Sequence, residues 1–107
     1  MTEDSVVIRI ATLSDLEALL PLVRDFYTLF SYPYSEERKS AALAQVLGDA
    51  ALGRVLLVEA EGTAVGYAVL AWSFSLEYDG RTAFVDELFV AERARGRGLG
   101  SHVLRRA

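Results

Sequence analysis

The stretch TAFVDELFVAERARGRGLGS, residues 82–101, joins an apolar run to a loop rich in glycine and arginine. Residues 82–90 have the composition of a β-strand. Glycines follow at positions 96, 98 and 100, directly before residues 101–107, which open a helix. Because glycine lets the main chain turn sharply, successive N–H groups can point into one hollow at the start of that helix. The stretch therefore predicts a strand that leads into an anion-binding loop.

The charges of the loop indicate which anion it binds. Arg95 and Arg97 stand beside the glycines, and a guanidinium grips a phosphate through two hydrogen bonds. We expect a phosphate or pyrophosphate here. Two familiar phosphate motifs do not match, because the dinucleotide fingerprint requires a glycine at Ser101 and the P-loop requires Gly-Lys-Ser/Thr.

Upstream, the sequence predicts one strand and two helices. Residues 5–11 are rich in β-branched side chains, which favours a strand. Ser14 and Glu17 have the spacing of a capping box before an apolar helical pattern, in which Pro21 should cause a kink or begin a second helix. Ser35 is the expected N-cap of the next helix, which Gly48 should end.

Three further strands are predicted over residues 54–60, 64–75 and 82–90. Glu61-Gly62-Thr63 and Asp79-Gly80 are the turns between them, so the three strands should form an antiparallel meander. The full order is β-α-α-β-β-β-loop-α. This order predicts one α/β domain over residues 1–107 with a mixed, largely antiparallel sheet.

Composition excludes several kinds of site. The chain has no cysteine, so disulfides and thiolate metal sites are excluded, and a single histidine, His102, predicts no metal site. His102 is expected to be a surface residue. No apolar run approaches the roughly 20 residues of a membrane span, and the N-terminus lacks the pattern of a signal peptide. We expect a cytoplasmic protein with no membrane partner.

Charge is distributed unevenly along the chain. All fifteen acidic residues precede Arg93, whereas five of the eleven basic residues lie from Arg93 onward. An acidic bulk disfavours nucleic acid as a partner, including an arginine-glycine contact to RNA. A basic tip of this kind suits a small polyanion instead.

The loop resembles the acyl-CoA loop of the GNAT superfamily of N-acyltransferases. That family's pattern is Arg or Gln, two residues, Gly, one residue, then Gly or Ala, and residues 95–100 match it. The order of the preceding elements is also similar, so the resemblance covers essentially the whole chain. It implies acetyl-CoA as the acyl donor, with its pyrophosphate held by Arg95, Gly96, Arg97, Gly98, Leu99, Gly100 and Ser101. It also implies that the main chain of Leu88, Phe89 and Val90 lines the pantetheine arm, while their side chains pack in the core.

Two adjacent carboxylates on the strand before the loop are candidate bases. An amine nucleophile must lose a proton before it attacks a thioester, and in similar sequences an acid on this strand often removes it. We favour Glu87, which shares strict alternation with Ala83, Val85 and Phe89. A bulge would switch the faces, and whether Asp86 or Glu87 is the base stays open. The alternative is that these carboxylates form salt bridges with Arg81 or a loop arginine.

An aromatic cluster lies at the junction of the two predicted helices. It consists of Tyr27, Phe30, Tyr32 and Tyr34. The resemblance implies that this region walls the pocket for the acceptor, although such aromatic side chains serve equally well as core contacts.

The resemblance also implies that the family's domain continues beyond residue 107. We therefore expect an incomplete domain that stops within the helix after the loop, or one completed by a second copy in a homodimer. The usual general acid, a tyrosine, would lie in the absent part. The expected activity is N-acetyl transfer from acetyl-CoA to a primary amine by direct transfer in a ternary complex, and the alternative is an acyl-CoA-binding module without turnover. The acceptor, a small-molecule or peptide amine, stays open, with the acidic balance favouring a cationic one.

Overall fold

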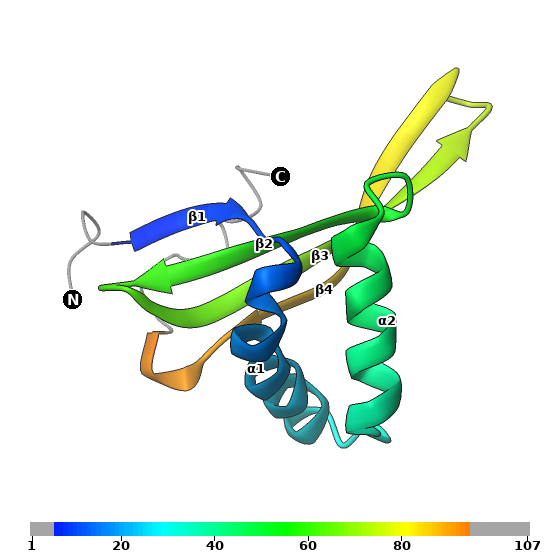
Figure 1. Ribbon diagram of the computed structural model, residues 1–107. Helices are drawn as coiled ribbons and strands as arrows, with labels where there is room; N and C mark the ends of the chain where they lie inside the picture. The colour runs from blue at the N-terminus through cyan, green and yellow to red at the C-terminus, as the bar shows by residue number, and fades with distance from the viewer. Residues whose placement is uncertain (1–5, 95–107) are drawn as a thin grey trace.

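A computed structural model of the chain describes residues 6–94 (Figure 1). The predicted acyl-CoA loop and the helix after it therefore lie outside the described residues. The elements in chain order are β1 (Val6–Ile10), the short 3-10 helix η2 (Leu13–Asp15), α1 (Leu16–Leu29), α2 (Glu36–Gly48), β2 (Gly53–Ala60), β3 (Thr63–Ser75), β4 (Gly80–Val90) and the 3-10 helix η3 (Glu92–Ala94). This order confirms the predicted β-α-α-β-β-β succession.

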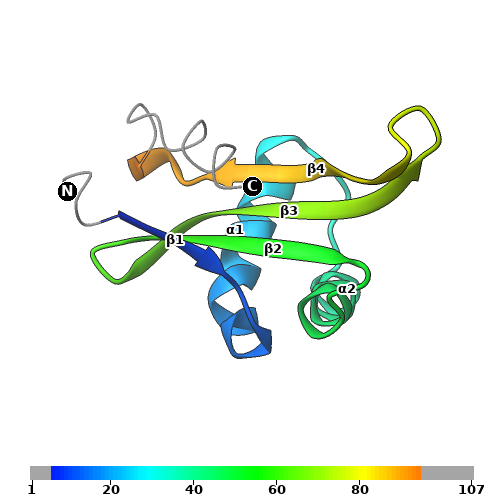
Figure 2. The same cartoon turned by 90° about the horizontal axis from the view of Figure 1, so that it is seen from above.

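The four strands form one antiparallel sheet in the order β1-β2-β3-β4, which Figure 2 shows from above. The predicted α/β fold with a largely antiparallel sheet is confirmed. The first turn of the meander has two residues, because Ala60 pairs with Thr63. Glu61 and Gly62 both have positive φ, 53° and 80°, as a tight hairpin turn requires.

Both helices cover the same face of the sheet (Figures 1 and 2). The core beneath them joins side chains of α1 and α2 to alternate residues of the strands, namely Leu19, Leu22, Val23, Leu43, Val55, Leu57, Tyr67 and Phe89. The residues between these on the strands form a second cluster on the opposite face, which includes Ile8, Leu56, Val58, Ala68 and Leu70. Because successive side chains of a strand point to opposite faces of the sheet, each apolar strand contributes to both clusters.

The predicted capping box, at Ser14 and Glu17, lies two residues too far along the chain: the observed one precedes the 3-10 helix η2, and α1 follows from Leu16. The carboxylate of Asp15, not Glu17, completes the capping interaction by accepting a hydrogen bond of 2.8 Å from the main-chain N–H of Thr12. Pro21 lies inside a continuous α1 and begins no second helix. At the next helix the prediction is confirmed, because Ser35 Oγ accepts from the N–H of Arg38 at 3.3 Å.

An ion cluster joins β1 to the start of α1. The guanidinium of Arg9 donates two hydrogen bonds to Asp15, of 2.8 and 2.9 Å, and one of 2.8 Å to Glu59 on β2. Asp15 is 9% exposed, so its charge is held away from bulk water. The hydrogen bonds from Arg9, and then from the main chain of Thr12, lower the pKa of Asp15 to about 2.

We expect Asp15→Asn to destabilise the protein by about 1–2 kcal/mol at pH 7. The loss is no larger because the Arg9 side chain is partly exposed, so solvent screens the ion pair. A carboxyl whose pKa is lower in the folded state stabilises the fold above its unfolded pKa of about 3.9. That contribution is lost as the pH falls through about 2. Urea unfolding of both proteins at several pH values should show the difference in unfolding free energy shrinking from pH 4 to pH 2. A difference that does not change with pH would contradict the assignment.

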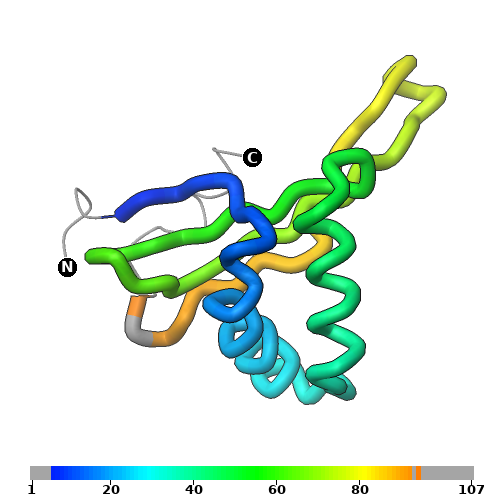
Figure 3. Tube along the Cα trace, viewed as in Figure 1, coloured from blue at the N-terminus to red at the C-terminus, as the bar shows by residue number. Residues whose placement is uncertain are grey.

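The ends of β3 and β4 extend beyond the other strands as a two-stranded ribbon (Figures 1 and 3). The last pair between β2 and β3 is Gly53 with Ala71, whereas β3 and β4 remain paired out to Ser75 and Gly80. The side chains of Phe74, Leu76 and Tyr78 on this ribbon are between 69% and 86% exposed.

Candidate active site

A β-bulge in β4 determines where the two candidate carboxylates point. Val69 of β3 pairs with Glu87, but the next residue, Leu70, pairs with Val85. Asp86 is therefore the extra residue. Because paired residues lie on the same face of the sheet, Glu87 shares the helix-covered face with Val69 and Phe89.

The predicted alternation along this strand is corrected by that bulge. Val85 pairs with Leu70 and Ala83 pairs with Trp72, so both lie on the face opposite Glu87. Only Phe89, on the C-terminal side of the bulge, keeps the expected relation to Glu87. On the C-terminal side of the bulge, Glu87 faces the helices. On its N-terminal side, Ala83 and Val85 face the other way, so this part of the alternation argument for Glu87 was wrong.

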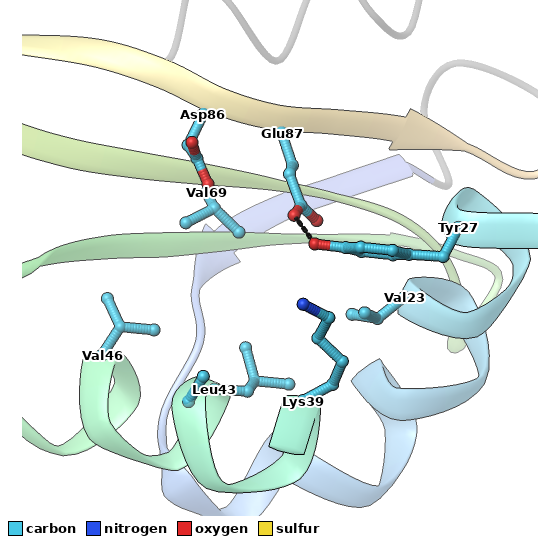
Figure 4. A pocket seen from close by; sticks show the side chains of 9 residues that line it. Val23, Tyr27, Lys39, Leu43, Val46, Val69, Asp86 and Glu87 are labelled. Atoms are coloured by element: carbon cyan, nitrogen blue, oxygen red, sulfur yellow. Dashed lines mark hydrogen bonds between the residues drawn. The ribbon is translucent and has the colours of Figure 1, made fainter. Parts of the chain in front are cut away.

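Two tyrosines from different elements hold the carboxylate of Glu87. The hydroxyl of Tyr67 on β3 donates to Oε1 at 2.8 Å. The hydroxyl of Tyr27 on α1 donates to Oε2, as Figure 4 shows. Tyr67 is fully buried. Burial, with the neighbouring charge of Glu87, raises the pKa of both tyrosines, so they remain protonated donors. Each carboxylate oxygen keeps a further lone pair for a proton or a substrate.

A cavity of about 290 Å³ lies between the two helices and the sheet, next to these groups (Figure 4). Its lining residues are Val23 and Tyr27 from α1, Lys39, Ala42, Leu43 and Val46 from α2, Val69 from β3, and Asp86 and Glu87 from β4. The walls are mostly aliphatic. Both candidate bases therefore face the same hollow.

Asp86 and Lys39 bring two further charges to the cavity. Within residues 6–94, the side chains of Asp86 and Lys39 have no hydrogen bond or ion pair. The Lys39 ammonium lies 4.6 Å from the centre of the Tyr27 ring. The alternative of a salt bridge with Arg81 is not observed, because the Arg81 guanidinium lies over the ring of Trp72, 5.0 Å from its centre.

The four predicted acceptor-site aromatics occupy different positions. Tyr27 lines the cavity, whereas Tyr34 lines a separate hollow and donates a hydrogen bond of 3.2 Å to Glu36. Phe30 and Tyr32 stack on each other, with ring centres 5.6 Å apart, and about half of each is exposed. Neither is among the residues that line these two hollows. Of these four aromatic residues, only Tyr27 lies next to Glu87.

Of the residues predicted to bind acetyl-CoA, the structure places only three. Leu88 and Val90 pack against the core on the face opposite the helices, and Phe89 is buried beneath α1. All three lie on β4, which forms an edge of the sheet within the described part of the chain. The predicted loop residues, Arg95, Gly96, Arg97, Gly98, Leu99, Gly100 and Ser101, lie outside the described residues, as does His102.

Sequence reasoning did not identify Tyr67 or Lys39 as site residues, although each carried a signal. Tyr67 is the one hydroxyl-bearing residue in the run AVGYAVLA, residues 64–71, and a buried tyrosine hydroxyl requires a partner. Lys39 precedes Leu43 by four residues and Val46 by seven, which places all three on one side of a helix. These two patterns could have drawn attention to Tyr67 and Lys39. Neither pattern indicates that both residues lie close to Glu87.

No group of three or more histidine, aspartate or glutamate side chains in residues 6–94 is placed to bind a metal ion together. None of the helices in that same part of the chain is long and apolar enough to cross a bilayer.

Comparisons with known proteins agree with this architecture. An integron cassette protein from the mobile metagenome of Cole Harbour Salt Marsh superposes with a TM-score of 0.88 at 36% identity, over 92% of this chain and 65% of its own. A GNAT family acetyltransferase from Staphylococcus aureus has a TM-score of 0.76 at 20% identity, over 95% of this chain and 74% of its own. A ribosomal-protein-alanine N-acetyltransferase from Brucella melitensis biovar Abortus has a TM-score of 0.75 at 20% identity, over 94% of this chain and 66% of its own.

The chain thus spans slightly less than two-thirds of the length of the first of these neighbours. A comparison with curated proteins gave no match. The model of the Acetyltransferase (GNAT) family matches residues 16–107, which is most of the chain. The fold and the family match agree with each other. The chain belongs to the GNAT acetyltransferase family.

Proposed function

We propose that this protein transfers an acetyl group from acetyl-CoA to a primary amine, directly and within a ternary complex. The observation that carries the proposal is the Glu87 carboxylate, which faces an apolar cavity and is held by Tyr27 and Tyr67. A fixed carboxylate at the end of a small cavity suits an ammonium ion that must lose a proton before it reacts. No cysteine occurs in the sequence to carry the acetyl group, which supports direct transfer.

Glu87 is the proposed general base. An alkylammonium has a pKa of about 10.4, so at neutral pH almost every acceptor arrives protonated. The Glu87 carboxylate takes that proton, directly or through one water molecule. The freed nitrogen then attacks the thioester carbon and a C–N bond forms. As the C–S bond breaks, CoA leaves with the electron pair on sulfur, the nitrogen gives up its second proton, and the sulfur takes up one proton, so that the products are the amide and free CoA. Tyr27 and Tyr67 position the base by occupying one lone pair on each of its oxygens.

The edge position of β4 supports binding of the acyl donor along this strand. Within residues 6–94, β4 pairs with no strand other than β3, and we place the acyl donor along its other side, where an added strand would lie. A bulge disrupts the ladder at Asp86, just before Leu88. A main-chain N–H near Leu88 is the proposed donor to the oxyanion that forms on the thioester carbonyl. The proposed pyrophosphate site is the loop at residues 95–101.

Acetyl-CoA is expected to raise the melting temperature. At a ligand concentration ten times Kd the gain is about 1.4 kcal/mol, or several degrees for a domain of this size. Gly98→Glu should abolish the shift, because a carboxylate would occupy the proposed pyrophosphate site. The matched control is Gly80→Glu on the projecting ribbon, where a side chain meets open space. No shift in the unsubstituted protein with acetyl-CoA or CoA would contradict the proposal.

The second candidate function is an acyl-CoA-binding module without turnover, which would use the same edge of β4 and the same loop at residues 95–101. Both functions predict the shift in melting temperature, but only the enzyme releases a thiol. Free CoA is therefore measured with a panel of primary amines. Binding of acetyl-CoA without release of CoA above the hydrolysis background identifies the module.

A further inference from the structure

We propose that Lys39 is itself an acetyl acceptor, so that the protein acetylates its own side chain in cis when acetyl-CoA is bound and no other amine occupies the cavity. This inference rests on the proposed function, because the reaction uses the same base and the same acyl donor. Its basis is the position of Lys39, a primary amine that lines the cavity together with Glu87. Lys39 is then a modification site as well as part of the cavity wall.

Lys39 is the single lysine of the sequence. Apart from the α-amino group, it carries the only primary amine that this chain can offer to an acyl donor. The other basic residues, His102 aside, are arginines, whose guanidinium groups stay protonated and do not act as nucleophiles. The one side chain with the chemistry of an amine acceptor therefore lies in the cavity where an acceptor is proposed to bind.

The Lys39 ammonium lies close to the proposed base. It is 4.6 Å from the centre of the Tyr27 ring, and the hydroxyl of that same ring donates to Glu87. Figure 4 shows the Lys39 side chain reaching from α2 into the space beside Tyr27 and Glu87. Within residues 6–94 the ammonium has no hydrogen bond or ion pair that would hold it in place. Its four-carbon stem is flexible, so the nitrogen can move within the cavity.

The space around Lys39 can hold the product. Lys39 is half-buried, and it lines the second hollow, beside Arg38, as well as the cavity next to Glu87. The two hollows have volumes of about 290 and 270 Å³, whereas an acetyl group adds only a few atoms. Acetylation also removes the positive charge of the side chain, so the modified residue presents a neutral amide to the aliphatic walls.

The reaction is the proposed transfer with Lys39 Nζ as the nucleophile. Because Lys39 and Glu87 form no ion pair, Glu87 takes a proton from the ammonium through one water molecule. Nζ then attacks the thioester carbon and a C–N bond forms. The C–S bond breaks with its electron pair on sulfur, the nitrogen gives up its second proton, and the sulfur takes up one. The products are acetyl-lysine, free CoA and a proton. The amide is stable, so Lys39 does not pass the acetyl group on.

Intact mass spectrometry of the chain with acetyl-CoA and no added amine tests this inference. We expect a gain of about 42 Da, which is one acetyl group per chain, and peptide mapping should place it on Lys39. The rate should not change on tenfold dilution of the protein, because the transfer is intramolecular. Glu87→Gln should slow it by about 10²–10³. Pentylamine, which competes for the same cavity, should slow it as well.

The matched control is the double variant Arg38→Lys/Lys39→Arg. It moves the lysine by one residue, to the exposed neighbour outside the lining of the cavity, and leaves composition and net charge unchanged. A melting curve confirms that the variant folds. Its lysine should be acetylated at least tenfold more slowly than Lys39. Equal rates would mean that acetyl-CoA modifies any accessible lysine, and the inference would be wrong. A rate that falls on dilution of the unsubstituted protein would also overturn it, because the transfer would then occur between molecules.

Failure of the proposed function gives a different result. If pentylamine releases CoA but Lys39 stays unmodified without added amine, the inference is wrong and the proposed function stands. If Lys39 is acetylated but no added amine releases CoA, the inference holds and transfer to a separate amine fails. Absence of both reactions overturns the two together.

Discussion

Replacing Glu87 by glutamine is expected to lower kcat for amine acetylation by about 10²–10³ at pH 7, with the Kd for acetyl-CoA unchanged. Glutamine has nearly the same shape and keeps an oxygen that accepts from Tyr27 or Tyr67, but it cannot take a proton. The measurement is steady-state release of CoA with pentylamine as acceptor, alongside a melting curve to confirm that the variant folds.

The pH profile distinguishes a lost base from a displaced side chain. Without a base, the reaction depends on the free amine in solution, which increases tenfold per pH unit up to about 10.4. The deficit of Glu87→Gln should therefore narrow as the pH rises. A deficit that stays constant with pH would indicate a structural role only.

Asp86→Asn is the matched control, because Asp86 lines the same cavity and is the other candidate base. It should lower kcat by less than about tenfold, since the Asp86 side chain is exposed and no tyrosine holds it. If Asp86→Asn shows the larger loss and the pH-dependent recovery, the roles of the two carboxylates are reversed.

Replacing Gly53 by alanine is expected to cost about 3 kcal/mol of unfolding free energy. A β-carbon at this position would lie 2.1 Å from the main-chain oxygen of Leu70 and 3.2 Å from its carbonyl carbon. Those atoms belong to the paired strand β3, so relief requires β2 and β3 to move apart at the point where the ribbon leaves the sheet. We expect a fall of roughly 10 °C or more in the melting temperature.

Gly80→Ala is the control for this substitution. Gly80 also lies in a strand, but no atom is within 4 Å of the position that its β-carbon would take. Its effect should stay within about 0.5 kcal/mol. Similar losses at both positions would show that the general cost of a side chain at glycine, and not the contact with Leu70, explains the result.

The succession of elements followed from the sequence because its signals are local. Alternating β-branched residues, the serine at the start of α2 and the glycine turns act within a few residues of one another, so they predict β1 to β4 and both helices correctly. The capping box before the first helix was misplaced for a non-local reason. Asp15 is held by Arg9 of β1, a contact that competes with the Ser14 and Glu17 pattern and that the pattern does not contain.

The site was predicted in part. Asp86, Glu87 and Tyr27, three of the predicted site residues, line one cavity. Tyr67 and Lys39, which the sequence did not single out, come from elements that only packing brings to the same place. The order of Asp86 and Glu87 along the chain could not reveal which face each takes. One extra residue in β4 relative to β3 shifts the alternation, and that count belongs to the pairing of two strands.

The sequence by itself determined the element order, the family and the presence of two carboxylates on the last strand. Tertiary structure alone decided that Glu87 faces the helices, that two tyrosines hold it, and that a lysine shares its cavity. The physical reason is the separation along the chain between the residues that interact. Helix, strand and turn preferences arise from neighbours along the chain, whereas the environment of Glu87 is made by residues 60 and 20 positions away, which meet it only when the helices pack on the sheet.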